Sequence, residues 1–219
     1  MMEPTTPFAS ALTSTGELEQ LYRQPSAAVL AKVTDHLDEG CRDFLSVATF
    51  ALVGTSDRDG RHDVSPRGGA PGFVRILDDN HLALPDLNGN NRLDTLRNII
   101  GNPGVGLLFL VPGMGEMLRI NGRAWITTDP ELLDRFTDQV RRPTTAIAVA
   151  VDEAYLHCAK SIRRGGLWEP TTWPGAAERP SAARIFIGHL GAGDSLSPEQ
   201  VEADLEAGYV AGLAADQPT

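Results

Sequence analysis

Residues 44–66, FLSVATFALVGTSDRDGRHDVSP, contain the clearest structural signal in the sequence. The stretch opens with an apolar, β-branched run that stops at the turn-forming sequence Asp57-Arg58-Asp59-Gly60. Valine, threonine and aromatic residues favour strands, whereas aspartate and glycine favour tight turns. Residues 61–66 are then expected to form a returning strand. This stretch therefore predicts a β-hairpin.

More strands follow along the chain. Residues 73–77 and 81–85 flank the turn-forming Asp78-Asp79-Asn80 and predict a second hairpin. Apolar and β-branched runs predict three further strands, over residues 105–113, 116–129 and 145–160.

Helices are expected around these strands. Apolar residues recur at helical spacing over residues 26–39, between a serine that can cap the start and a glycine that can end it. Similar signals predict helices over 92–100, with Asn91 as N-cap, and over about 130–140, with proline at the first position. A capping-box sequence at Ser197 predicts a C-terminal helix.

The number and spacing of the strands indicate the fold class. Six or more short strands with short connections argue against a doubly wound parallel sheet, because each parallel crossover needs a dozen residues or more. The sequence therefore predicts an antiparallel, barrel-type α+β fold. A length of 219 residues with 42% apolar content suits one main domain. Residues 163–180, rich in Gly, Pro, Trp and Arg, predict a loop or lid.

Charge and cysteine content argue against several classes of function. The formal net charge is -10 at pH 7, which opposes binding to nucleic acid and to anionic membranes. Neither a membrane span nor an export signal is expected. Cys41 and Cys158 are far apart and in no CxxC pair, so neither a disulfide framework nor a zinc cluster is predicted. The cytoplasm is the expected compartment.

Two loops at strand ends place an arginine beside backbone suited to an oxyanion. In Ser65-Pro66-Arg67-Gly68-Gly69, the hydroxyl and the guanidinium can bond phosphate oxygens, and the glycines allow close approach. Asn88-Gly89-Asn90-Asn91-Arg92 leads into a helix N-terminus with unpaired N–H groups. Each loop alone also fits an ordinary turn with a solvated arginine. In an acidic chain, the two together favour an anion site.

A third candidate follows the last predicted strand. The run from Lys160 to Arg164 is cationic, and the glycines after it lead to Trp168, whose indole could cover a planar ring. The alternative interpretation is a solvated connector. The histidines are scattered without metal-ligand spacing and no GxSxG sequence occurs, so no metal site is predicted and no nucleophile is assigned.

These segments resemble a known family. The sequences DVSPRGGAPGFVRILDDNHLALPDLNGNNRLDTLRNIIGNPGVGLLFLVPG (63–113) and LRINGRAWI (118–126) are similar to the pyridoxamine 5'-phosphate oxidase-like, FMN-binding split-barrel family. The resemblance covers about residues 44–126, and HCAKSIRRGGLW (157–168) resembles an uncharacterised branch of that family. The chain departs from the true oxidase at Leu93, where the oxidase has a lysine directly after the phosphate arginine, and it lacks the oxidase's C-terminal substrate-binding pattern with arginine and histidine. Both departures argue against pyridoxamine phosphate as substrate.

The resemblance implies a six-stranded split barrel that forms a homodimer, with FMN in clefts at the subunit interface. It further implies that Arg67 and Asn91-Arg92 hold the phosphate and that the strand into Ser65 and the segment Leu84-Pro85-Asp86 line the flavin. The expected cofactor-binding residues are Ser65, Pro66, Arg67, Gly68, Pro85, Asp86, Asn91, Arg92, Lys160 and Trp168.

The sequence leaves three functions open. The first is an FMN-dependent oxidoreductase that acts on a small substrate, with no catalytic residue assigned. The second is a non-catalytic flavin-binding protein, and the third is a split barrel that uses a deazaflavin or haem. The expected organisation is a helical extension over residues 1–40 packing on the barrel, the FMN-binding barrel over 41–160, and a loop or lid with a helix over 161–219.

Overall fold

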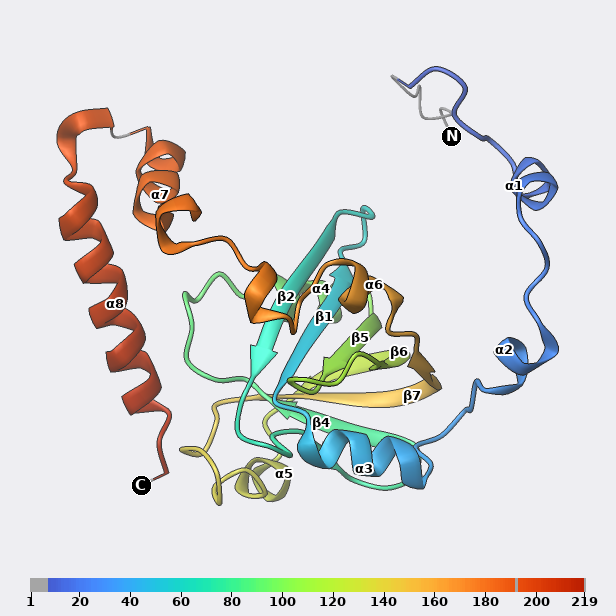
Figure 1. The fold of residues 1–219 in the computed structure, drawn as a ribbon. Helices are drawn as coiled ribbons and strands as arrows, with labels where there is room; N and C mark the ends of the chain where they lie inside the picture. Colours follow the sequence, from blue (N-terminus) through green and yellow to red (C-terminus); the bar gives the residue numbers. More distant parts are fainter. Residues whose placement is uncertain (1–7, 192, 219) are drawn as a thin grey trace. The chain divides into compact units, whose positions relative to one another are not determined.

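A computed structural model of the chain describes residues 8–191 and 193–218 (Figure 1). Residues 1–7, 192 and 219, which belong to the predicted extension and C-terminal segment, lie outside the described residues. The boundary between two compact units lies after Val33. The smaller unit contains α1 (Thr15–Leu21) and α2 (Ala27–Ala31). The packing of the N-terminal extension on the barrel stays a prediction.

The larger unit is built on an antiparallel sheet. Its described strands are β1 (Phe50–Ser56), β2 (His62–Gly68), β3 (Arg75–Ile76), β4 (His81–Pro85), β5 (Gly104–Leu110), β6 (Met117–Thr127) and β7 (Ala146–His157). They pair in the order β2-β1-β5-β6-β7-β4-β3. The predicted, mostly antiparallel α+β split barrel is confirmed. The strand predicted over residues 73–77 is reduced to the two residues of β3, at one edge of the sheet.

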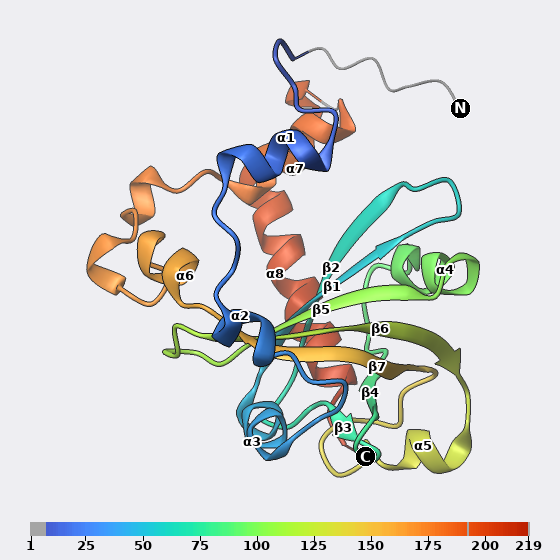
Figure 2. The ribbon, with the colours of Figure 1, turned by 90° about the vertical axis from the view of Figure 1, so that its right-hand side faces the viewer.

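Helices flank the sheet. In the larger unit they are α3 (Glu39–Val47), α4 (Asp94–Gly101), α5 (Pro130–Asp134), α6 (Lys160–Arg164), α7 (Ala182–Leu190) and α8 (Pro198–Ala215). Short 3-10 turns occur at Pro170–Thr172, Ala176–Glu178 and Gly193–Ser195. Figure 2 shows α4 beside the hairpin of β1 and β2. Helices α7 and α8 pack on each other through Ala183, Ile187 and Val201.

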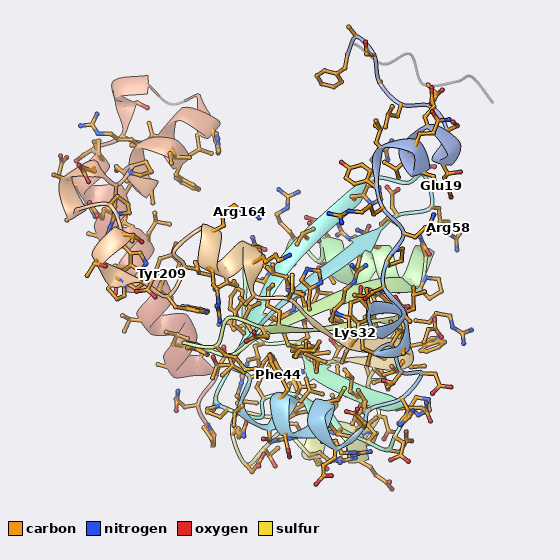
Figure 3. The ribbon with its side chains drawn as sticks, turned by 45° about the vertical axis from the view of Figure 1, so that its right-hand side comes forward. Glu19, Lys32, Phe44, Arg58, Arg164 and Tyr209 are labelled. Carbon is orange, nitrogen blue, oxygen red and sulfur yellow. The ribbon has the colours of Figure 1, made fainter. Side chains whose placement is uncertain are left out.

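Strand alternation explains where the core lies. In β1, Ala51 and Val53 are fully buried, whereas Phe50 on the other face is partly exposed. Helix α3 covers the buried face with Phe44, which is labelled in Figure 3, and Leu45. Because residues i and i+2 of a strand share a face, the register between β1 and β2 determines which β2 side chains turn toward the core.

Several other predicted elements differ in extent from the structure, three of them markedly. The helix predicted over 26–39 is wrong: α2 ends at Ala31, and Thr34 forms a β-bridge with Ala154, which takes the backbone out of the helical path. Asp38 then caps α3 by accepting a hydrogen bond from Cys41 N, so the apolar run from Phe44 begins as helix and not as strand. Helix α5 ends at Asp134 and is shorter than predicted.

The pairing of β6 with β7 contains a bulge at Gly122. Asn121 pairs with Glu153 and Gly122 pairs with Val151, so Asp152 has no partner residue on β6. A Cβ on Gly122 would overlap the carbonyl oxygen of Ala150. Glycine is therefore required here for close approach of the two backbones.

A helix that crosses a membrane must be long and predominantly apolar. None that the structure describes combines the length and the apolar character needed to cross a bilayer.

The two cysteines differ in reactivity. Burial, reinforced by Asp38, raises the pKa of the Cys41 thiol to about 12, whereas Cys158 is exposed. The thiolate is the reactive form, and at pH 8 a thiol of this pKa is ionised in only about one molecule in ten thousand. We expect one fast thiol equivalent with Ellman's reagent in the native protein and a second only after unfolding. Two equally fast equivalents would contradict the placement of Cys41.

Candidate functional site

A cavity of about 710 Å³ lies in the larger unit, where the predicted anion-binding loops meet. Its walls come from β2, the end of β4 with the loop after it, the start of α4 and the end of α8. Of the predicted cofactor-binding residues, eight line it: Ser65, Pro66, Arg67, Gly68, Pro85, Asp86, Asn91 and Arg92. The structure thus brings both loops to one place, while their role in binding stays a prediction.

Strand β2 supplies one wall. Asp63, Ser65 and Arg67 alternate along it and therefore share one face. Ser65 pairs with Val53 and Arg67 with Ala51, both buried, so this face continues the core side of the sheet. The three side chains are half-buried because β2 is an edge strand that projects beside α4 and not over the centre of the core.

The loop after β4 supplies a second wall. Asn91 and Leu93 have φ values of 57° and 60°, a left-handed conformation that is uncommon for residues other than glycine. Asn90 Oδ1 accepts a hydrogen bond from Arg92 N at 3.1 Å. The prediction of Asn91 as N-cap was wrong. Leu93 is the N-cap and makes no side-chain hydrogen bond, because the two left-handed residues of the loop delay the start of α4.

Arg92 is paired within this wall. Its Nε donates to Asp94 Oδ2 at 2.7 Å, and the Arg92 side chain is 75% exposed. Ion pairs this exposed contribute at most about 1 kcal/mol, because water screens them and the side chains lose freedom. The guanidinium can therefore exchange Asp94 for a more strongly charged anion.

A hydrogen-bonded group centred on Asp63 joins β2 to α4. Asp63 Oδ2 accepts from Ser65 Oγ at 2.9 Å and from Thr95 Oγ1 at 3.2 Å. Thr95 is only 2% exposed. The sequence interpretation included Ser65 but missed Asp63 and Thr95, because their meeting depends on how α4 packs against β2.

Asp86 lies at the end of β4, half-buried in the cavity wall. Burial raises the pKa of its carboxyl group, while the positive charge of Arg67 and the hydroxyl of Thr145 act in the opposite direction. Arg67 also donates from Nη1 to the carbonyl oxygen of Pro66 at 2.8 Å. The wall around Arg67 thus contains one cation and one carboxylate whose charged form is disfavoured.

The raised pKa of Asp86 makes stability depend on pH. The folded protein binds this proton more tightly than the unfolded chain, so the stabilising contribution is present below the ordinary pKa of 3.8 and is lost as the pH rises through the folded-state value. We expect Asp86→Asn to be more stable than the wild type at pH 7, by less than about 1 kcal/mol after solvent screening. Thermal unfolding should show that the extra stability of Asp86→Asn over the wild type decreases toward pH 3.5. A variant that is less stable than the wild type at pH 7 would contradict this prediction.

The end of α8 closes part of the cavity. Leu213 and Asp216 line it, and Asp216 Oδ1 accepts a hydrogen bond from Asn88 N at 3.2 Å. The carbonyl oxygen of Asp216 accepts from Arg141 N at 2.8 Å. Nothing in the sequence of α8 indicated this role, since the contact joins segments that are distant along the chain.

Lys160 and Trp168 do not line this cavity. Trp168 donates from Nε1 to the carbonyl oxygen of Met114 at 2.7 Å and packs on the cluster of Leu110, Met117 and Ile162. Lys160 is exposed at the start of α6. The structure therefore separates these two residues from the other eight, and their contact with a cofactor stays a prediction.

Metal ions in proteins are held by grouped His, Cys, Asp and Glu side chains. Among the residues that the structure describes, no three or more His, Cys, Asp or Glu side chains are grouped so that they could hold a metal ion.

A known protein family matches the part of the chain that contains most of the cavity. The sequence profile of the family described as pyridoxamine 5'-phosphate oxidase matches residues 37–158. The chain belongs to this family. The range matched by the pyridoxamine 5'-phosphate oxidase family includes β1 to β7, the loop after β4 and α4, whereas α8 lies outside it.

Solved structures similar to this chain share low sequence identity. HupZ of Group A Streptococcus is 18% identical, with a TM-score of 0.45, over 54% of this chain and 92% of that chain. General Stress Protein 26 of Bacillus anthracis is 16% identical, with a TM-score of 0.40, over 53% and 89%. A FAD-binding protein of Mesorhizobium loti is 17% identical, with a TM-score of 0.37, over 57% and 96%. No curated protein matches the chain in sequence.

Proposed function

We propose that the chain binds FMN in this cavity and acts as an oxidoreductase, which transfers hydride or electrons between a reduced nicotinamide or small substrate and an acceptor. The observation that carries the proposal is that Arg67 and Arg92 line one cavity together with the asparagine- and glycine-rich loop at 88–91. Guanidinium groups and loop N–H groups are the donors that proteins use for phosphate.

The cavity's size and lining fit such a cofactor. Its volume of about 710 Å³ lies in the range of small-molecule and cofactor sites. Phe73, Leu87 and Leu96 supply apolar surface against which a planar ring could pack.

The charge of the cavity limits which anion it accepts. Against the two guanidiniums, the lining contains four carboxylate side chains, those of Asp63, Asp86, Asp94 and Asp216. FMN has a single phosphate and a neutral ring. Its phosphate can bind the two guanidiniums, and the rest of the molecule brings no further negative charge near the carboxylates. A deazaflavin with a longer anionic tail would meet more repulsion, so FMN is the better fit.

When bound, FMN supplies redox chemistry at its ring. The chain's own residues have simpler tasks. Arg67 and Arg92 bind and orient the phosphate, residues 89–91 of the loop offer backbone donors, and the apolar side chains exclude water from the ring. None of these tasks needs a side chain to gain or lose a proton.

The proposal includes a homodimer with FMN at the subunit interface. Strands β1, β2 and β6 expose large apolar side chains, with Phe50 at 39%, Val64 at 63% and Trp125 at 51% exposure. A second copy would remove this apolar surface from water. Since Lys160 and Trp168 do not line the cavity of their own chain, they would reach a flavin only from the second copy.

The test is an absorption titration of the purified protein with FMN and, separately, with a deazaflavin cofactor. Saturable binding of FMN with a shifted flavin spectrum supports the proposed cofactor. Anaerobic reduction of the bound flavin by NAD(P)H and its reoxidation by an acceptor then support the oxidoreductase. Bound FMN that no reductant or acceptor turns over would favour the non-catalytic flavin-binding protein, and binding of the deazaflavin alone would overturn FMN.

A further inference from the structure

The wall formed by Asp63, Ser65 and Thr95 offers hydrogen-bond acceptors but no free hydroxyl proton. Both hydroxyls donate to Asp63 Oδ2, at 2.9 Å from Ser65 Oγ and 3.2 Å from Thr95 Oγ1. A hydroxyl has one proton and two lone pairs, and an ionised carboxylate only accepts. The hydrogen-bonding groups that remain available on this wall are therefore acceptor lone pairs, together with one negative charge.

Such a wall discriminates between parts of a ligand. An ionised phosphate presents acceptor oxygens and negative charge, so it cannot satisfy these lone pairs and is repelled by Asp63. Ser65, whose hydroxyl we expected from sequence to bond a phosphate oxygen, has its proton committed to Asp63. A group that faces this wall must donate hydrogen bonds.

The wall also lies close to the two cations along the chain. Ser65 is two residues from Arg67 on β2, a rise of about 7 Å in a strand. Thr95 follows Arg92 by three residues, at the start of α4. A phosphate held by either guanidinium would therefore leave the neighbouring atoms of the same ligand against the wall.

We propose that Asp63, with Ser65 and Thr95, recognises the hydroxyl groups of a polyol chain next to the phosphate, and that Asp63 selects ligands with this chain. The inference rests on the proposed function, in which the ligand is FMN and the chain is its ribityl group. It adds a specificity determinant that does not touch the phosphate.

The experiment compares riboflavin, which carries the polyol, with lumiflavin, which has a methyl group in its place. Both lack the phosphate, so the ratio of their dissociation constants reports on the chain alone. The wild type is expected to favour riboflavin, and Asp63→Asn to reduce that preference roughly tenfold, because hydrogen bonds to a charged acceptor are the stronger ones. Asp59→Asn, an exposed carboxylate in the adjoining turn, serves as control and should leave the ratio unchanged.

The outcomes separate the inference from the proposed function. If the wild type binds FMN but does not favour riboflavin, or if Asp63→Asn leaves the ratio unchanged, the inference is overturned while FMN binding stands. If the wild type binds no flavin, both are overturned. Should Asp63→Asn fail to fold by circular dichroism, Ser65→Ala keeps the carboxylate and should lower the ratio by a smaller factor; an unchanged ratio there would also overturn the inference.

Discussion

The Gly122→Ala variant is expected to lose about 3 kcal/mol of unfolding free energy, at the upper end of the range for overpacked positions. The added Cβ would overlap the carbonyl oxygen of Ala150, and it would also lie 3.3 Å from Asp152 N. These neighbours are backbone atoms of the paired strand, so they cannot move aside as a flexible side chain can. Thermal unfolding should show a melting temperature lower by roughly 6 to 12 °C.

Gly54→Ala is the matched control for this variant. Gly54 also lies inside a strand, but a Cβ there would approach Gly106 O at 3.5 Å, an ordinary contact. We expect its melting temperature to change little. If both variants were equally destabilised, loss of glycine from the sheet and not the bulge would be the cause.

Removal of either cavity guanidinium is expected to weaken FMN binding by roughly 10- to 150-fold, which corresponds to the about 1.5 to 3 kcal/mol of a charged hydrogen bond. Arg67→Ala removes the cation on β2, and Arg92→Ala removes the one before α4. Fluorescence titration with FMN measures each effect, and stability should change little because both side chains are partly or largely exposed.

The control for these variants is Arg123→Ala. Arg123 lies on β6, outside the cavity lining, and its side chain is 60% exposed and forms a long ion pair with Asp152. Its loss should leave FMN affinity unchanged. Unchanged affinity in both Arg67→Ala and Arg92→Ala would show that the phosphate is not held where we propose.

Elements with local signals could be predicted from the sequence. The hairpin around Asp57-Arg58-Asp59-Gly60 forms as expected, with Phe50 to Ser56 paired on His62 to Gly68. Ser197 caps α8 through a hydrogen bond from Gln200 N, as its capping-box sequence predicts. The two arginine loops could be found because arginine, asparagine and glycine cluster at strand ends, and the sheet then brings those ends together.

Features that depend on distant contacts could not be predicted. The helix expected over 26–39 ends early because Thr34 finds a partner in Ala154, which no local propensity reveals. The sequence around Asp63 predicts a strand and gives no sign of a binding residue. Thr95 reaches Asp63 through the packing of α4 against β2. Helix α7 was not foreseen, because its sequence follows a segment rich in proline and glycine.

The hydrogen bond between Asn88 and Asp216 joins residues 128 positions apart. At synthesis rates of about 5 to 20 residues per second, the last barrel strand, β7, is complete about 3 to 12 s before the end of α8 is made. The barrel can therefore begin to fold while this side of its cavity is still open. A flavin that depends on the complete enclosure would therefore bind only after the end of α8 has been synthesised and has reached the loop at Asn88.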